Sequence, residues 1–299
     1  MLKIIINADD FGLNEKVNEG ILRSFRNGIL RSASLMANGN SFEQAVGIIN
    51  SNPNLDIGVH LTLVEEKPIL DIDKIPTLVN KNGNSRTNAI EFARKYFSEK
   101  ISLEEIKKEF TAQIEKILDH GIKISHIDSH QHLHMLPKIL DITIELANQY
   151  NIKFVRFPKE KFSSYMFRNF KSIYRIVQMV AINHFCNRAV EKITTKTDYF
   201  TGFYFGGKLS KKNFLTLINY LPSEGMCELM CHPGLNPNSN IYDQSQYRQV
   251  DETLTLIDKD VAEVIKQKDI EITSFRNLLL SYQPPLSTLR IIVSYFFLM

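Results

Sequence analysis

The sequence has only three cysteines in 299 residues and no tryptophan. Cys186, Cys227 and Cys231 cannot form the disulfide framework of a secreted protein, so we expect a reducing compartment, most simply the cytoplasm. No apolar segment with a cleavage site precedes Asp9, so no signal peptide is expected. The apolar run at residues 289–299 is far shorter than the roughly 20 residues that span a bilayer, so no transmembrane helix is expected.

The sequence also lacks a strong excess of either charge, because 36 basic and 33 acidic residues leave a formal charge of +3. Global electrostatics therefore favour a small-molecule ligand and give no reason to expect a nucleic-acid partner. No glycine-rich phosphate loop follows the first predicted strand, which argues against nucleotide binding. What the chain does have is 43% hydrophobic residues, enough for one large core in a single domain.

Short β-branched runs alternate with longer segments of helical period, which predicts βα units and a mainly parallel sheet, an α/β fold. Strands are expected at residues 3–7, 32–36, 56–59, 123–127, 153–155, 227–230 and 270–273, and helices at 15–26, 42–50, 103–119, 137–149, 211–221 and 244–267. The strands stop at unusual polar residues, and reactive groups of βα barrels come from strand carboxyl ends. We therefore favour an irregular (β/α) barrel over residues 1–280, followed by an apolar tail at 281–299.

Two adjacent carboxylates, Asp9 and Asp10, directly follow the first predicted strand. They repel each other unless a cation or a shared proton compensates their charge, and a metal ion is the simplest answer. The alternative is that one of them caps the following helix. Asn14 is better placed for that cap, because it stands immediately before the periodic segment, and this weakens the alternative.

Histidines follow three other predicted strands. The densest group is HIDSHQHLH at residues 126–134, where an extended backbone would place four histidines and Asp128 on one face. The alternative is a histidine-rich loop that binds metal incidentally. His60 and His232 each end an apolar strand, and each could instead be an ordinary core histidine. Cys227 and Cys231, near His232, give only a weak indication of zinc.

One aspartate and two histidines from separate strand ends would leave coordination positions for water and substrate, as a catalytic metal site requires. Such a site could hydrolyse an amide, an ester or a phosphoester. The residue types alone therefore predict metal-assisted hydrolysis and do not choose among these substrates.

Four motifs occur in order along the chain: NADDFG at 7–12, GVHL at 58–61, HIDSHQHLH at 126–134 and MCHPG at 230–234. Together they resemble the YdjC-like carbohydrate deacetylases, the group that includes chitooligosaccharide deacetylases, from residue 4 to about 276. The resemblance implies a distorted (β/α) barrel, related to that of the polysaccharide deacetylases. It also implies one divalent metal ion and removal of acetyl groups from N-acetylated sugars or small oligosaccharides. The ligand types suit Zn²⁺ and the family points as often to Mg²⁺, so the metal stays open.

The resemblance also assigns roles to individual residues. The metal ligands that it implies are Asp10, His60 and His130. Asp9 is the base that deprotonates the attacking water, and His232 is the acid or the oxyanion stabiliser. Arg156 is expected to orient a carboxylate or bind substrate, and Asp128 to orient a liganding imidazole or bind substrate.

One segment departs from the family pattern. Residues 151–196 contain ten Lys or Arg and two Glu, a net charge of +8, mixed with aromatic and aliphatic residues. We expect an insertion at about 158–198. A basic amphipathic segment can lie on an anionic membrane surface, with help from residues 289–299, and the substrate would then include lipid-linked sugars. The alternative is a lid or a homodimer contact whose charges are solvated.

Two other functions compete with the sugar deacetylase. A metal-dependent phosphoesterase would usually need more carboxylates and a second metal. A non-catalytic, membrane-associated sugar-binding protein is disfavoured, because candidates for the base, the ligands and the acid are all present.

Overall fold

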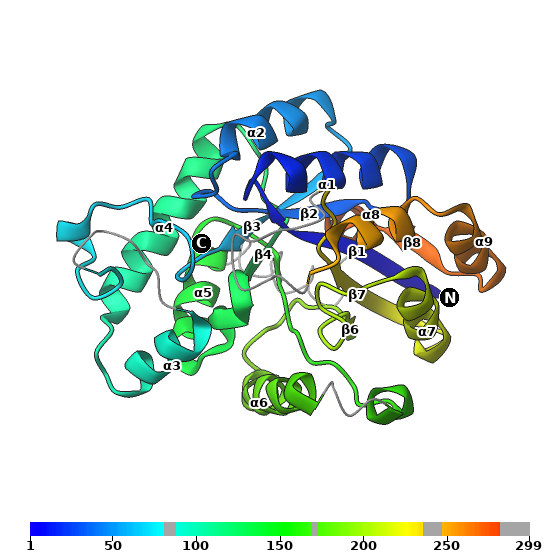
Figure 1. Ribbon diagram of the computed structural model, residues 1–299. Coiled ribbons are helices and arrows are strands. Elements are labelled where there is room, and N and C mark those ends of the chain that lie inside the picture. Colours follow the sequence, from blue (N-terminus) through cyan, green and yellow to red (C-terminus); the bar gives the residue numbers. More distant parts are fainter. Residues whose placement is uncertain (81–87, 169–172, 236–246, 282–299) are drawn as a thin grey trace, which may run out of the picture.

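A computed structural model of the protein describes residues 1–80, 88–168, 173–235 and 247–281 (Figure 1). Its centre is an eight-stranded sheet in which every strand pair is parallel. The order across the sheet is β5-β4-β3-β2-β1-β7-β6, and β8 pairs with β1. The predicted α/β fold with a mainly parallel sheet is confirmed.

The described strands begin and end close to the predicted positions. They are β1 (Leu2–Phe11), β2 (Ser32–Leu35), β3 (Asp56–Leu61), β4 (His126–Ser129), β5 (Phe154–Val155), β6 (Tyr199–Thr201), β7 (Gly225–Cys231) and β8 (Glu271–Thr273). Strand β6 was not predicted from the sequence.

The helices cover the outer face of the sheet, with α1 and α2 on one side and α4 and α5 beside β3 and β4 (Figure 1). They are α1 (Glu15–Asn27), α2 (Phe42–Ser51), α3 (Ala89–Phe97), α4 (Leu103–Asp119), α5 (Pro137–Gln149), α6 (Ile173–Ala189), α7 (Lys211–Tyr220), α8 (Gln249–Leu256), α9 (Lys259–Gln267) and α10 (Phe275–Ser281). Three short 3-10 helices are η1 (Ile72–Lys74), η2 (His130–Met135) and η3 (Ser164–Arg168).

Helix ends follow local capping chemistry. The Asn14 side chain accepts hydrogen bonds from Lys16 N and Val17 N, both at 3.0 Å, so it caps α1 as predicted. The prediction of a single helix at 244–267 is wrong for the described residues of this range. There the chain forms α8 and α9, because Asp258 accepts from Asp260 N and starts a new helix. Residues 244–246 lie outside the described residues.

The two edge strands of the sheet, β5 and β6, meet through an irregular seam. Glu160 forms an isolated parallel bridge with Phe200, and its buried carboxylate accepts from Thr201 Oγ1 at 2.7 Å and Tyr204 N at 2.8 Å. Val155 N also donates to Thr195 O, at 3.4 Å. These contacts curl the sheet into the distorted barrel that was expected.

Parallel strands place all their carboxyl ends at one edge of the sheet, where reactive groups collect. Helix α10 covers the opposite edge: Phe275 stacks on His126 at the start of β4, and Arg276 N donates to Asp56 at the start of β3. The expected insertion at 158–198 contains η3 and α6. The expected tail beyond residue 281 lies outside the described residues. Among the described helices, none combines the length and hydrophobicity that a membrane span requires.

Candidate functional site

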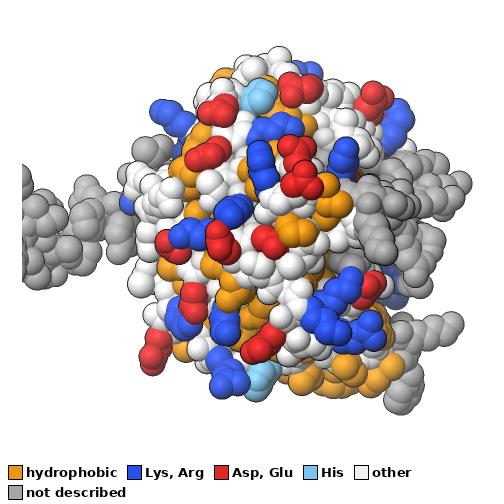
Figure 2. Space-filling view, turned by 90° about the vertical axis from the view of Figure 1, so that its left-hand side faces the viewer, with side chains coloured by type: hydrophobic (Ala, Val, Ile, Leu, Met, Phe, Trp, Pro, Cys, Tyr) orange, Lys and Arg blue, Asp and Glu red, His pale blue; other side chains and the backbone are white. Residues whose placement is uncertain are grey.

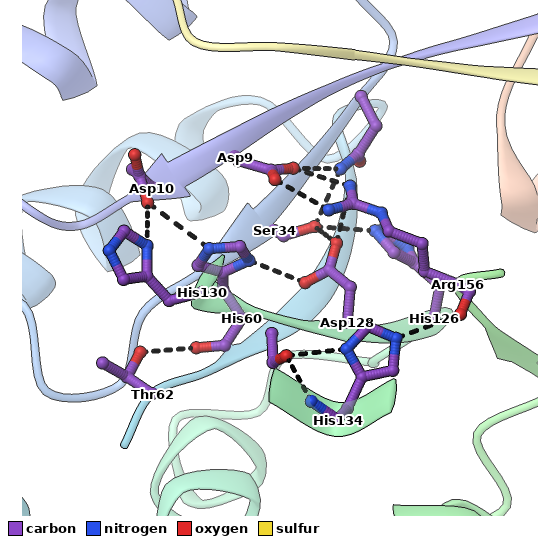
Figure 3. A network of polar contacts seen from close by, with 12 residues as sticks. Asp9, Asp10, Ser34, His60, Thr62, His126, Asp128, His130, His134 and Arg156 are labelled. Carbon is purple, nitrogen blue, oxygen red and sulfur yellow. Dashed lines mark hydrogen bonds and ion pairs between the residues drawn. The ribbon is translucent and has the colours of Figure 1, made fainter. Parts of the chain in front are cut away.

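Strand β1 ends in a turn that sends its two aspartates in different directions (Figure 3). Asp10 has a φ of 64°, in the left-handed region that Asp adopts more readily than most residues. The register with β2 also shifts between Ala8 and Phe11. As a result, the Asp10 carboxylate faces His60 and His130, whereas the Asp9 carboxylate faces Arg156.

Asp10, His60 and His130 form one buried group. Asp10 Oδ1 is 3.3 Å from His60 Nε2 and 2.9 Å from His130 Nδ1. One ligand atom from each residue lies within 4.8 Å of the other two, a spacing that could hold a metal ion. One carboxylate and two imidazoles suit a divalent first-row ion, so the donor set fits the metal that was expected.

The electrostatics of this group favour positive charge. Burial alone would raise the pKa of Asp10, but His130 and His60 lower it well below its usual range. Burial would lower the pKa of both histidines, yet the neighbouring carboxylates raise it to about 9 for His60 and about 10 for His130. The carboxylates that raise the pKa of the two histidines would also attract a metal cation.

Asp128 orients the ring of His60. Asp128 Oδ1 is 2.7 Å from His60 Nδ1, and Ser34 Oγ donates to Asp128 Oδ2 at 2.6 Å. With Nδ1 held by a carboxylate, His60 Nε2 is left to face Asp10. Carboxylates fix the tautomer and direction of metal-binding histidines in this way.

Glu65 contacts the far side of His130, and the sequence analysis missed it. Its Oε2 lies 2.9 Å from His130 Nε2, and its φ of 69° is unusual for a glutamate. The signal was available, because Glu65 and Glu66 form a second pair of adjacent carboxylates soon after β3.

Arg156 collects three carboxylates in a second buried network. It makes a bidentate ion pair with Asp9, at 2.7 and 2.6 Å, and its Nη2 lies 2.7 Å from Asp128 Oδ2. Its Nε donates to Glu228 Oε1 at 2.7 Å, and its side chain has 0% exposure. Asp9, His60 and Asp128 also have metal-ligand spacing. The guanidinium already supplies the positive charge there, so the metal fits the Asp10 group.

The run of histidines does not stay extended, so the prediction of one shared face is wrong beyond Ser129. Strand β4 ends at Ser129, and Gln131 and His132 have φ values of 55° and 54°, which turn the chain into η2. His130 turns toward Asp10, while the His132 ring lies among aromatic side chains, 5.5 Å from Phe203.

His126 and His134 are structural. His126 Nε2 lies 3.0 Å from Ser34 Oγ, and His134 Nε2 donates to the Arg156 carbonyl at 3.0 Å. Burial lowers the pKa of both to about 4, which keeps them neutral at physiological pH. His134 thereby fixes the backbone that carries the guanidinium.

His232 follows β7 and lines the same small pocket as His60 and His130. Its backbone N donates to Glu252 Oε2 at 2.5 Å, and its ring stands edge-on to Tyr247 at 5.1 Å. Its Nδ1 is buried and has no hydrogen-bond partner in the described part of the chain. The pocket, about 40 Å³, is lined by Asp9, His60, His130, Gln131, His132, Arg175, Phe203, Gly206, Met230, His232 and Tyr247.

The pocket therefore brings together four of the residues that the sequence singled out: Asp9, His60, His130 and His232. Asp10 lies behind its wall, in contact with both histidines. Arg156 and Asp128 do not line it, and the contacts described for them are internal. These contacts fit the orienting roles that the sequence suggested, whereas binding of substrate by either residue stays a prediction.

The fold and this group define an α/β-barrel protein with a buried Asp-His-His set at the carboxyl ends of its strands. The model of the family described as YdjC-like protein matches residues 3–267. The chain belongs to the YdjC-like family, as its four motifs predicted.

Two relatives show how far the similarity extends. The protein of Clostridium beijerinckii named carbohydrate deacetylase is 31% identical over 279 residues, 93% of this chain and 100% of that one. The carbohydrate deacetylase of Thermoanaerobacter pseudethanolicus is 30% identical, over 92% of this chain and 98% of its own.

A solved structure shares the fold. The crystal structure of a putative cellobiose-phosphate cleavage protein from Enterococcus faecalis V583 matches with a TM-score of 0.73 and 28% identity. The match covers 92% of this chain and 98% of that chain.

Proposed function

We propose that this protein is a metal-dependent carbohydrate deacetylase that hydrolyses the acetamide of an N-acetylated sugar or small oligosaccharide. The observation that carries the proposal is the buried Asp10-His60-His130 group beside Asp9 and His232 at one pocket. Membership of a family whose relatives are named carbohydrate deacetylase points to the same reaction.

Asp10, His60 and His130 would hold one divalent ion, either Mg²⁺ or Zn²⁺. A bound ion supplies Lewis acidity, which polarises a carbonyl oxygen and makes water a better nucleophile. Asp128 and Glu65 keep the two histidines in place through their hydrogen bonds to the ring nitrogens.

Asp9 and His232 carry the proton transfers in this proposal. The Asp9 carboxylate lines the pocket and takes a proton from the attacking water, while Arg156 holds it in one orientation through two hydrogen bonds. His232 lines the same pocket, and its buried Nδ1 has no hydrogen-bond partner among the described residues. It donates a proton to the departing amine or a hydrogen bond to the oxyanion.

The second group with metal-ligand spacing, Asp9, His60 and Asp128, does not support the phosphoesterase alternative. Asp9 and Asp128 already share the Arg156 guanidinium, which disfavours a second metal ion beside the first. A two-metal phosphoesterase centre needs that second ion.

The test is release of acetate from a panel of N-acetylated sugars and oligosaccharides, with Mg²⁺ or Zn²⁺ supplied. We expect acetate from at least one substrate, and none after chelation of the metal. Asp9→Asn should lower turnover about 10²- to 10⁴-fold with metal retained, as for loss of a general base. Asp10→Asn should lose the metal. Phosphate release from a phosphosugar without any acetate would refute the proposal, and equal metal loss in both variants would refute the assigned roles.

A further inference from the structure

Helix α6 exposes apolar side chains on its outward side. Ile173 and Val177 are 60% exposed and Val180 is 54% exposed, and their spacing of four and three residues puts them on one side of the helix. Met179 and Cys186 are buried on the inward side. An apolar stripe along a helix normally faces protein or lipid. On α6 this stripe lies at the surface.

Neighbouring aromatic side chains enlarge this apolar surface. Phe162 and Phe167, just before α6, are 41% and 60% exposed, and their rings lie 6.4 Å apart. Phe97 at the end of α3 is 59% exposed and stacks on Phe185 of α6 at 6.3 Å. Hydrophobic side chains gather along the lower edge of Figure 2, and α6 lies at the bottom of Figure 1. Exposed apolar surface of this kind marks interaction sites.

We call the exposed surface made by Ile173, Tyr174, Val177 and Val180 the α6 face.

Exposed basic residues occur in the same segment of the chain as the α6 face. Lys159 and Lys161 are exposed and flank Glu160, whose carbonyl accepts a hydrogen bond from the buried Asn183 side chain of α6 at 2.8 Å. Arg188 is exposed about two turns beyond the apolar stripe. Of the two glutamates in residues 151–196, Glu160 is buried and so contributes little to the surface charge. The segment therefore combines an exposed apolar stripe with exposed basic residues.

The α6 face also borders the candidate active site. Arg175, in the first turn of α6, lines the pocket and donates from Nη2 to Gly206 O at 3.0 Å. The start of the apolar stripe, Ile173 and Tyr174, is one and two residues away. A surface that docks through this helix would lie next to the pocket mouth.

We infer that the α6 face docks on an anionic lipid surface as a peripheral membrane contact. Apolar side chains that enter the headgroup region, with lysine and arginine around them, are the usual means by which interfacial helices bind such membranes. A second copy of the chain fits less well. A two-fold interface would bring together two copies of a segment in which Lys159, Lys161 and Arg188 are exposed.

Docking would place the pocket beside the bilayer surface, within reach of N-acetylated sugars carried on lipids. This consequence rests on the proposed function. Membrane binding itself does not, because it requires neither the metal nor turnover.

The test uses the full-length protein and flotation with two kinds of vesicle, pure phosphatidylcholine and an equal mixture of phosphatidylcholine and phosphatidylglycerol. We expect binding to the anionic vesicles only, and weaker binding as salt is raised. Val177→Glu removes an inserted side chain and adds a repelled charge, so it should weaken binding about ten-fold or more. Leu254→Glu is the matched control, because Leu254 is 50% exposed on α8, away from α6. It should bind like the unchanged protein.

Absence of binding to anionic vesicles at low salt would overturn the inference, as would equal binding by the Val177→Glu variant. A concentration-dependent dimer in light scattering that Val177→Glu dissolves, without vesicle binding, would assign the face to a second copy instead. Acetate release from a soluble substrate is measured in parallel and should not change in Val177→Glu. Failure of the deacetylase proposal is therefore visible separately from failure of this one.

Discussion

The two adjacent aspartates at the end of β1 belong to two regions that compensate the same charge differently. In the Asp9 region, the cation is the guanidinium of Arg156, which is covalently part of the chain and fully buried. In the Asp10 region, the partners are the imidazoles of His60 and His130. A fixed cation makes Asp9 part of the permanent structure, whereas imidazoles can lose their protons to admit a metal ion. Neighbouring residues of one type can thus serve different purposes.

The Asp9 region also holds more negative charge than one guanidinium balances. Arg156 contacts Asp9, Asp128 and Glu228. Burial raises the pKa of Glu228 to about 7, although Arg156 opposes the shift. Its Oε2 is buried and has no hydrogen-bond partner among the described residues. The Glu228 carboxyl is therefore partly protonated near neutral pH, which lowers the negative charge around Arg156.

The largest effect is expected from breaking the Asp9 region. Arg156→Met removes the cation and leaves buried carboxylates without a partner, which should lower the free energy of unfolding by about 3–5 kcal/mol. Urea denaturation of the metal-free protein measures it. Arg31→Met is the control, because half-buried Arg31 donates, within the described part of the chain, to the backbone carbonyls of Gly28 and Leu30. We expect about 1 kcal/mol there. A similar loss of unfolding free energy in both variants would mean that the Arg156 network stabilises the fold no more than ordinary hydrogen bonds do.

Binding of a metal ion by the Asp10 region should stabilise the folded protein. At about a hundred times the dissociation constant, a bound ion adds about 2.7 kcal/mol to the free energy of unfolding. We expect this gain in the unchanged protein and in Asp9→Asn, and none in Asp10→Asn. Thermal unfolding with and without Zn²⁺ or Mg²⁺ measures it. If metal stabilised Asp10→Asn but not Asp9→Asn, the metal would bind in the Asp9 region and not in the Asp10 region.

The sequence predicted the strand ends because these are local patterns, and the resemblance to the family then selected the ligand candidates among the polar residues found there. Asp10, His60 and His130 each follow a short apolar run, and parallel strands bring such residues to one edge whatever the connections between them. Helices α4 and α5 have the predicted bounds for the same reason, since periodicity and caps are local signals.

The Arg156 network could not be predicted in detail because its members are far apart in the chain. Asp9 and Arg156 are separated by 147 positions, and Glu228 lies 72 positions beyond Arg156. A strand-end arginine indicates an ion pair, but only the barrel shows which carboxylates it meets. Ser34 gave no signal for the same reason, because its partner Asp128 is 94 positions away.

The prediction after Ser129 failed because alternation of residue types does not determine backbone angles. HIDSHQHLH reads as a strand, yet Gln131 and His132 adopt left-handed φ values and turn the chain. That turn directs His130 toward Asp10 and leaves His134 to hold the Arg156 carbonyl. Local strain at such positions is set by the surrounding contacts, which a period-2 pattern does not contain.

The smallest of these effects should come from Asp128, which touches both regions. Its Oδ1 faces His60 and its Oδ2 faces Arg156. Asp128→Asn keeps the shape and removes the charge that orients the ligand ring, so metal affinity should fall about 10- to 100-fold. Calorimetric titration with metal measures it. In Ser34→Ala, which removes one hydrogen bond to Asp128 and keeps the Asp128 charge, metal affinity should fall less. Unchanged metal affinity in Asp128→Asn, with a stability loss like that of Arg156→Met, would place Asp128 in the Asp9 region alone.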